Sequence, residues 1–230
     1  MADRKTQSLE DLQQQILSLS LPPGSDLDEA SLCDTYGMSR TPLREVLQRL
    51  AGDGFVTLTQ NRGAKVVPMD LPTMRTFFQT APMVYANIAR LAASNRTDSQ
   101  VHDLKRIQLR FRTATDHCDA AKSAMVNHAF HGKIGQMADN PYLKPALDRM
   151  LIDHTRMSQT FYRPSNDADI RRVQTACDQH DQMIVAFESR NPDLAADLTL
   201  KHWDLSRDQM ERFVRPDPLP IDMPEIANAV

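Results

Sequence analysis

The residues in this sequence with the clearest capacity for chemistry are histidines that recur at helical spacing in its second half. The chain has seven histidines, and all of them follow residue 100. Three lie on apolar helical stripes, so we expect them to point into a core. Imidazole nitrogen is a common ligand of zinc and nickel. The three histidines could close around one divalent metal between helices, or they could be unrelated, hydrogen-bonded core residues.

The candidate metal ligands are His131, His180 and His202, with the amide oxygen of Asn127 one helical turn before His131. The three stripes consist of Ala124, Asn127, His131, Ile134 and Ala138; of Ile170, Val173, Cys177, His180, Ile184 and Phe187; and of Leu194, Leu198, His202 and Leu205. Such a site would leave coordination positions for water or a small ligand. His128 and His154 are rival ligands, but we expect both at the surface.

Helices are expected to position these histidines, because apolar residues recur with helical periodicity from Leu71 to Phe213 and no strand pattern competes. The pattern predicts six or seven helices. Breaks between them are expected at Asn95-Arg96, Asp116-His117, Asn140-Pro141, Pro164-Ser165 and Asn191-Pro192. We therefore assign residues 71–214 to an all-helical domain. Residues 215–230 contain four prolines and are expected to form a Pro-rich tail.

The first 70 residues predict three short helices followed by a β-hairpin. The first two helices are indicated by apolar stripes at Leu9, Leu12, Ile16 and Leu19, and at Leu32, Cys33 and Tyr36. The hairpin is indicated by two strand patterns, Phe55–Thr59 and Ala64–Val67, joined by a turn that ends at Gly63. This order of elements is typical of a winged helix-turn-helix, in which the third helix enters the major groove of DNA.

The third helix carries the polar face that such a role requires. Ser39 is expected to cap it, and Pro42 suits its first turn. Its apolar face consists of Leu43, Val46, Leu47, Leu50 and Ala51. Arg40 and Arg44 lie one turn apart on another face, where they could bind guanine edges or phosphates. The alternative is an ordinary solvated helix face, because a few arginines alone have low specificity for DNA binding.

Composition and charge restrict the class of protein. The chain has 230 residues, and its hydrophobic and charged fractions, 41% and 25%, are ordinary for a globular protein. Its net charge of −3 disfavours a protein that binds polyanions over its whole surface. Residues 39–65, however, hold five basic against two acidic residues. Three scattered cysteines and no apolar signal segment favour the cytoplasm over an exported, disulfide-bonded or membrane protein.

The first 70 residues resemble the winged-helix domain of the GntR family of bacterial transcriptional regulators. The resemblance covers about residues 8–68, through PPG, the pair Leu27 and Glu29, the segment SRTPLRE, the pair Arg49-Leu50 and the wing glycine. Because one winged helix covers only a half-site, we expect a homodimer on a palindromic operator in double-stranded DNA. The implied DNA contacts are made by Ser39, Arg40, Thr41, Arg44, Arg49, Arg62 and Gly63. Ala30 replaces an arginine that is common in relatives, so one contact is missing.

The remainder is similar to the FCD effector domain of the FadR subfamily within GntR. The similarity is carried by Asn127-His-Ala-Phe-His131, Asn140-Pro-Tyr-Leu143, His180 and His202. In that family an aspartate and three histidines bind zinc, nickel or manganese, and a small carboxylate effector often coordinates the metal. By position, these ligands are Asn127, His131, His180 and His202. Asn127 replaces the aspartate, and because an amide carries no charge, we expect weaker metal binding.

These patterns together predict a cytoplasmic transcriptional regulator, a repressor, with an effector-binding and dimerisation domain over residues 71–214. The effector is expected to be an organic acid bound near the metal site. One alternative is a metal-dependent enzyme that uses the histidines to activate water. The other alternative is a DNA-binding protein without an effector. No acidic residue stands at a fixed spacing from the histidines as an obvious general base, so we prefer the regulator and expect no catalytic residues.

Overall fold

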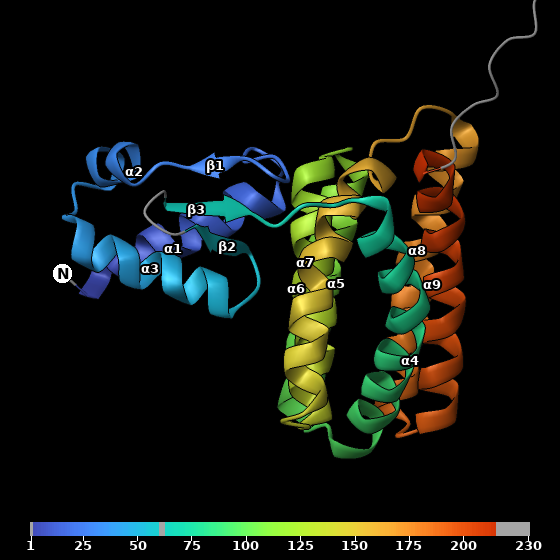
Figure 1. The fold of residues 1–230 in the computed structure, drawn as a ribbon. Helices are drawn as coiled ribbons and strands as arrows, with labels where there is room; N and C mark the ends of the chain where they lie inside the picture. Colours follow the sequence, from blue (N-terminus) through green and yellow to red (C-terminus); the bar gives the residue numbers. More distant parts are fainter. Residues whose placement is uncertain (1, 60–62, 215–230) are drawn as a thin grey trace, which may run out of the picture.

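The computed structural model describes residues 2–59 and 63–214, which form nine helices and three short strands (Figure 1). The elements from α1 to β3 form one compact unit, called the N-terminal unit below. The elements from α4 to α9 form a helical bundle beside it. A mainly helical fold, with a winged helix-turn-helix before an all-helical bundle, is therefore confirmed. The tail predicted for residues 215–230 lies outside the described residues.

The N-terminal unit contains three helices and a small antiparallel sheet. The helices are α1 (Ala2–Leu17), α2 (Glu29–Tyr36) and α3 (Arg40–Gly52), and the strands are β1 (Asp26–Leu27), β2 (Val56–Thr59) and β3 (Gly63–Val66). The strand order is β1-β3-β2, with Val56 opposite Val66 and Asp26 opposite Lys65. The predicted hairpin is confirmed with bounds shifted by one residue. The sequence analysis missed β1, because a strand of two residues has no measurable periodicity.

Apolar stripes of α1 and α3 form the core of this unit. Leu12, Ile16, Leu43 and Leu50 have no exposed surface. Leu19, which was predicted to continue the stripe of α1, lies beyond the end of the helix with a φ of 64°. Tyr36 of α2 donates a hydrogen bond of 2.6 Å to Asp11 of α1, which ties these two helices together. The stripe of α3 therefore packs inward and leaves its polar face toward solvent.

Six helices form the bundle within the described part of the chain. They are α4 (Leu71–Asn95), α5 (Asp98–Asp116), α6 (Ala120–Ala138), α7 (Leu143–Phe161), α8 (Asp167–Glu188) and α9 (Pro192–Val214). All five predicted breaks are confirmed. Side-chain caps explain several of the starts: Asp70 accepts from the backbone of Thr73, and Thr97 forms a capping box with Gln100. Within the described ranges, no helix combines the length and apolar character needed to cross a membrane.

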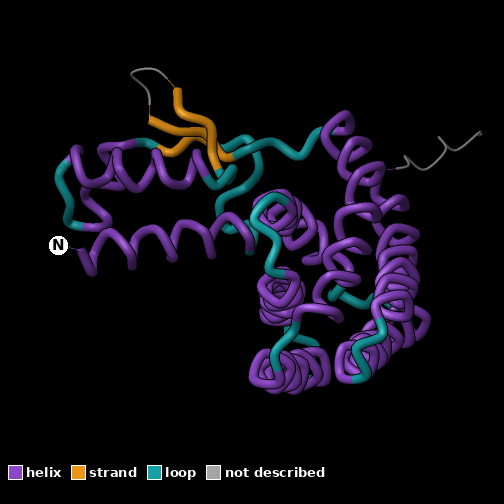
Figure 2. The backbone as a smooth tube through the Cα atoms, turned by 90° about the horizontal axis from the view of Figure 1, so that it is seen from below, coloured by secondary structure: helices purple, strands orange, loops and turns teal. Residues whose placement is uncertain are grey.

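The two units meet along α7. Figures 1 and 2 show the N-terminal unit beside the bundle, with the end of α1 against α7. Ile152 of α7 is buried in the core of the N-terminal unit, whereas Leu147 and Leu151 of the same helix are buried in the bundle core. One helix is thus shared by both cores.

Candidate nucleic-acid interface and metal centre

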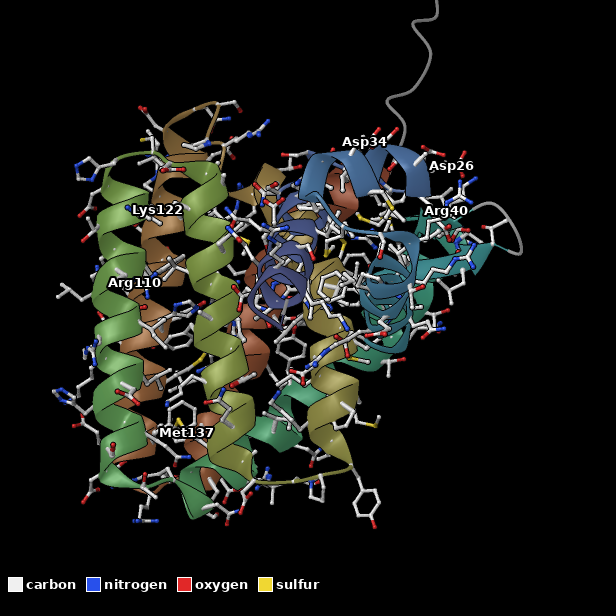
Figure 3. All side chains as sticks on the ribbon, turned by 90° about the vertical axis from the view of Figure 1, so that its left-hand side faces the viewer. Asp26, Asp34, Arg40, Arg110, Lys122 and Met137 are labelled. Atoms are coloured by element: carbon white, nitrogen blue, oxygen red, sulfur yellow. The ribbon has the colours of Figure 1, made fainter. Side chains whose placement is uncertain are left out.

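The first residues of α3 form the exposed basic end that was predicted to bind DNA. Ser39 occupies the N-cap position, but its side chain makes no capping hydrogen bond, so the expected cap bond is absent. Its hydroxyl is therefore available to a ligand. Arg40 and Thr41 are exposed, and Arg40 projects outward from the N-terminal unit (Figure 3). Arg49, near the other end of α3, is exposed as well.

Arg44 is exposed but held in place by an acidic neighbour. Its Nε donates to both carboxylate oxygens of Glu29, at 3.0 and 3.1 Å. Glu29 is the first residue of α2, so this ion pair joins α2 to α3. The pair raises the pKa of Arg44 through the hydrogen bond and the charge of Glu29. The sequence analysis treated Glu29 only as part of a motif and missed this orienting contact.

Of the two predicted wing residues, the structure describes only Gly63. Arg62 lies outside the described residues. Gly63 is buried with a φ of +90°, and a Cβ atom there would lie 2.4 Å from the backbone oxygen of Leu27. Glycine is thus required so that β3 can approach β1. This structural requirement explains Gly63 without any contact to DNA.

Three of the predicted metal ligands come together in the bundle. His131 of α6, His180 of α8 and His202 of α9 are each at most 4% exposed. One ligand atom from each lies within 4.8 Å of the others, and the Nε2 atoms of His180 and His202 are 3.3 Å apart. Phe130 stacks on His180 with ring centroids 3.9 Å apart. Among the histidine, cysteine and acidic side chains of the described residues, these three histidines are the group whose ligand atoms lie close enough together to hold a metal.

Glutamine side chains fix the orientation of two of these rings. Nδ1 of His180 lies 3.1 Å from Oε1 of Gln108, whose own amide nitrogen donates to the carbonyl of Cys177 at 2.9 Å. That second bond fixes which end of Gln108 faces the histidine, so Nδ1 of His180 must carry the proton. Gln179 Oε1 lies 3.0 Å from Nδ1 of His202. Nε2 of His180 therefore presents a lone pair toward Nε2 of His202, as the ring of a metal-bound histidine does toward its metal.

The remaining two candidate ligands are buried polar atoms without partners. Oδ1 of Asn127 and Nε2 of His131 make no hydrogen bond, and Asn127 is 1% exposed. Buried polar atoms in native proteins nearly always have a partner, and leaving one unpaired costs about 1–3 kcal/mol. Binding of a divalent metal is one way to satisfy such atoms. Asn127 is buried on the same helix as His131, one turn before it, and remains a predicted ligand.

Burial keeps the cluster neutral and ready to bind a cation. It lowers the pKa of His131 and His180 well below the ordinary value, and the neighbouring histidines lower both further. Burial alone lowers the pKa of His202 to about 4. Neutral imidazole is the form that binds metal.

Comparison with known proteins identifies the architecture. Residues 6–66 match the model of the bacterial regulatory proteins of the gntR family, and residues 83–205 match that of the FCD domain. The chain belongs to the GntR family of bacterial transcriptional regulators that carry an FCD domain. Its predicted membership of GntR is thereby confirmed, and DNA binding and transcriptional regulation are the functions of that family.

Individual relatives of this GntR-family regulator cover most of its length. It is 25% identical over 199 residues to the Nta operon transcriptional regulator of Aminobacter aminovorans, covering 86% of this chain and 90% of the relative. It is 26% identical over 190 residues to the HTH-type transcriptional repressor RspR of Escherichia coli, covering 75% and 83%. The solved structure of E. coli McbR/YncC has the same fold, with a TM-score of 0.78 at 17% identity, over 94% of this chain and all of that one.

The residues of this GntR-family regulator fit a divalent metal such as zinc. Three imidazole nitrogens lie close together, the buried Asn127 could add an amide oxygen, and Gln108 and Gln179 contact two of the rings. The set lacks a negative charge, because an asparagine stands where an acidic oxygen ligand would supply one. A hard cation such as manganese is therefore favoured less than zinc or nickel.

Two sequence predictions about the other histidines of this regulator are wrong. His154 of α7 is 3% exposed and therefore no surface group. Its Nδ1 lies 3.0 Å from the hydroxyl of Tyr85, and its ring packs against His131 with centroids 5.5 Å apart. His128 is half-buried, with its Nδ1 2.8 Å from the hydroxyl of Thr155. Spacing missed His154 because α7 is buried around its whole circumference from Leu151 to Gln159. His128 lies on α6 and is partly covered where it meets Thr155 of α7.

Two stripe positions of this regulator also differ from expectation. Ile170 and Leu194 were predicted to point inward, but they are 44% and 40% exposed. Each lies in the first turn of its helix, α8 or α9, beyond the region that neighbouring helices cover. Periodicity shows on which face of a helix a residue lies, but it does not show how far along the helix a neighbouring helix covers that face.

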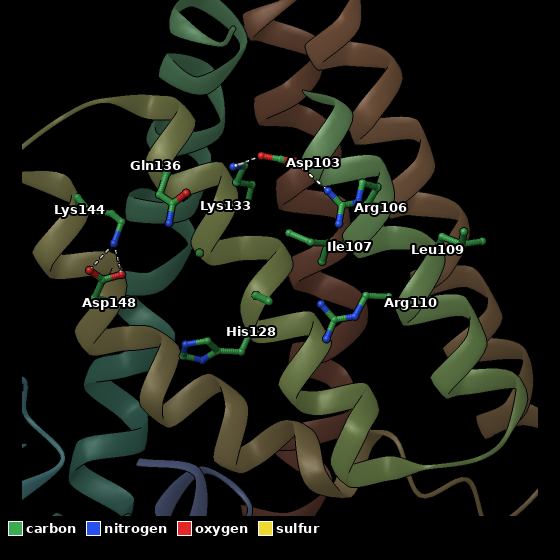
Figure 4. A pocket seen from close by; sticks show the side chains of 12 residues that line it. Asp103, Arg106, Ile107, Leu109, Arg110, His128, Lys133, Gln136, Lys144 and Asp148 are labelled. Carbon is green, nitrogen blue, oxygen red and sulfur yellow. Dashed lines mark hydrogen bonds and ion pairs between the residues drawn. The ribbon is translucent and has the colours of Figure 1, made fainter. Parts of the chain in front are cut away.

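An open groove on the outside of the bundle is separate from the histidine cluster. It has a volume of about 690 Å³ and lies between α5, α6 and α7 (Figure 4). Its acidic residues are paired within the groove, Asp103 with Lys133 and Asp148 with Lys144. None of His131, His180 and His202 lines it. The groove and the candidate metal centre of this GntR-family regulator are therefore distinct features.

Proposed function

We propose that this protein is an effector-responsive repressor, of the FadR subfamily, that acts in the cytoplasm. Residues 1–70 would form the DNA-binding domain, residues 71–214 the effector-binding and dimerisation domain, and residues 215–230 a tail. One winged helix covers one half-site, so a symmetric homodimer would bind a palindromic operator. The observation that carries the DNA-binding role is the exposed N-terminal end of α3, where Ser39, Arg40 and Thr41 are all accessible.

In this proposal the polar residues of α3 contact different parts of the DNA. Arg40 and Arg44 would contact base edges or phosphates, Ser39 and Thr41 would bind phosphates, and Arg49 would contact the backbone. Arg62 and Gly63 belong to the proposed wing, and only Arg62 has a side chain that could bind the minor groove. Repression is supported by the similarity to RspR, a transcriptional repressor that is 26% identical to this chain.

Fluorescence anisotropy tests the DNA-binding role. Titration onto the DNA upstream of the protein's own gene should give sequence-specific binding that weakens as salt rises. Arg40→Ala should remove most of the specific affinity, whereas Arg110→Ala, at an exposed arginine of α5, should leave it unchanged. Equal binding by wild type and Arg40→Ala would contradict the role assigned to α3.

The effector is proposed to be a small organic acid that coordinates a metal held by Asn127, His131, His180 and His202. A metal bound there would supply a positive charge that attracts a carboxylate. The orphaned Oδ1 of Asn127 and Nε2 of His131 support this proposal. We propose a ligand sensor and not an enzyme, because the groups that surround these histidines are glutamine and aromatic side chains.

A thermal-shift experiment tests the sensor role. Zn²⁺ should raise the melting temperature of metal-free protein, and citrate should raise it further only when Zn²⁺ is present. Lack of any shift with zinc, nickel or manganese would contradict the metal site. It would leave the DNA-binding role standing, because the anisotropy experiment measures that role independently.

A further inference from the structure

Helix α7 carries a fully buried arginine at the boundary of the two units. The side chain of Arg156 has no exposed surface. Its Nη1 donates a hydrogen bond of 2.7 Å to the carbonyl of Val67, in the connection between β3 and α4. Its Nη2 forms an ion pair with Asp153, one turn earlier on α7. Arg156 therefore connects the bundle directly to the segment through which the N-terminal unit is attached.

Two neighbouring side chains of α7 reach other parts of the N-terminal unit. Asp153 also accepts from Arg149 at 2.9 Å, and Arg149 packs against Gly54 so closely that a Cβ there would lie 2.4 Å from its Cδ. Gln159 donates to the carbonyl of Leu17, the last residue of α1, at 3.1 Å. The N-terminal unit is thus held at three places, by side chains from one helix.

The energetic cost of burying Arg156 indicates what it contributes. A buried ion pair adds little net stability, because desolvation offsets much of the attraction, and an apolar side chain often stabilises a fold as well. Its Nε has no partner, which adds to the cost. A buried ion pair and its hydrogen bonds do, however, restrict geometry more strictly than apolar contacts do. Arg156 and its polar contacts therefore contribute more to a fixed orientation than to the free energy of unfolding.

We propose that Arg156 is a positioning residue that fixes the N-terminal unit in one orientation on the bundle. The effect of this orientation on DNA binding rests on the proposed function. In a dimer, a fixed orientation sets the separation of the two DNA-contacting helices. Two residues earlier on α7, His154 packs against His131 of the candidate metal centre. The helix that holds the N-terminal unit is therefore also in contact with the proposed sensor site.

The orientation can be measured with cysteines that the chain already has. Cys33 is half-buried in the N-terminal unit, Cys118 is exposed on the bundle, and Cys177 is buried. Spin labels on Cys33 and Cys118, in full-length protein diluted with unlabelled protein, report the distance within one chain. We expect a single narrow distance distribution for wild type. Arg156→Met, which keeps the bulk and removes the donors, should broaden it.

Matched variants separate positioning from general damage. Arg112→Met removes an arginine of α5 that pairs with Asp178 and Asp181 of α8 on the surface of the bundle, and it should leave the distribution narrow. Arg156→Lys keeps the positive charge beside Asp153 but replaces the guanidinium fork that also reaches the carbonyl of Val67, and it provides a second test if Arg156→Met does not fold. Circular dichroism verifies folding in each case. A narrow, wild-type distribution in folded Arg156→Met, or in Arg156→Lys if the first variant is unfolded, would overturn the proposal.

The ratio of affinities for operators with different half-site spacing provides a second test, because a residue that only stabilises the fold would not change this ratio. Lengthening the spacer between half-sites should weaken wild-type binding by at least about tenfold. In Arg156→Met this ratio should fall toward one, because loosely held units tolerate either spacing. An unchanged ratio in the folded variant would also overturn the proposal. If no operator is bound at all, the proposed function fails, whereas the distance measurement still decides the positioning role.

Discussion

Nε2 of His180 and Nε2 of His202 lie 3.3 Å apart, and Nδ1 of each ring lies within hydrogen-bond distance of a glutamine side-chain oxygen. Because Nδ1 of His180 carries the proton, its Nε2 directs a lone pair toward Nε2 of His202 in a buried site. That lone pair can accept a proton from Nε2 of His202 or bind a cation that both rings share. The relationship brings two imidazole nitrogens close enough to bind one cation, which the presence of three histidines alone does not show.

Gln108 should therefore control metal affinity without touching the metal. Gln108→Leu removes the acceptor at Nδ1 of His180, so the ring loses its fixed tautomer and Zn²⁺ affinity should fall by about 10–100-fold. Isothermal titration calorimetry with Zn²⁺ measures this change. Gln136→Leu, at an exposed glutamine of α6, serves as the control and should bind as wild type does. Equal affinity in Gln108→Leu would contradict the tautomer assignment.

Asn127→Asp should strengthen metal binding. A carboxylate in this buried position adds a negative charge beside the cation, and we expect the affinity for Zn²⁺ to rise by at least about tenfold. Mn²⁺ should gain more than Zn²⁺, because it prefers oxygen ligands with charge. Metal-free Asn127→Asp should melt at a lower temperature than wild type, since the charge is then buried without a partner. A metal affinity that stays constant would exclude Asn127 as a ligand.

Acid should destabilise the metal-free protein before its carboxylates are protonated. Burial lowers the pKa of His202 to about 4 and that of His154 to about 3, so the unfolded chain binds more protons than the folded chain between these values and the ordinary value of 6.5. Stability is therefore complete above the unfolded pKa and is lost as pH falls toward the folded pKa. The shift of His202 alone corresponds to roughly 3 kcal/mol.

Urea unfolding in the presence of a chelator measures this pH dependence. The free energy of unfolding should fall steadily from about pH 7 to about pH 4.5. His102→Gln, at an exposed histidine of α5, should show the same slope as wild type. His202→Gln should show a shallower slope, because one titrating group is gone. A flat profile over this range would show that the cluster is accessible to water.

Glu29→Gln should reduce specificity for the operator rather than all DNA binding. The variant frees Arg44 from its ion pair, so its guanidinium is no longer fixed before DNA arrives. Removing a negative charge also favours non-specific binding to the DNA backbone. The ratio of operator affinity to random-sequence affinity should therefore fall, as anisotropy with competitor DNA would measure. Glu10→Gln is the charge-matched control on α1.

A pair of glycine substitutions should have opposite effects on stability. Gly63→Ala forces a Cβ atom against the oxygen of Leu27 at a φ of +90°, which should cost about 1–3 kcal/mol or more. Gly52→Ala lies in α3 with no atom within 4 Å of the added Cβ, and should stabilise the protein by roughly 0.5–1 kcal/mol. Thermal unfolding compares the two. A neutral Gly63→Ala would show that β1 and β3 separate easily.

Local pattern was sufficient to predict the helices and the wing. Helical periodicity and five breaks predict α4 to α9, because these signals depend on neighbours within a few residues. The winged-helix pattern and the inward direction of His131, His180 and His202 follow from the same local rules. The two-residue strand β1 and the burial of His154 do not, because each depends on a partner that is distant along the chain.

Tertiary structure alone decided how these elements act together. The sequence by itself indicated the family through its resemblance to known regulators, and residue spacing indicated the exposed face of α3 and the candidate ligands. Only the packed fold shows that Glu29 holds Arg44, that Gln108 orients His180, and that Arg156 of α7 binds the carbonyl of Val67. These contacts join residues 15, 72 and 89 positions apart. Periodicity carries no information about such pairs, because it describes one element at a time.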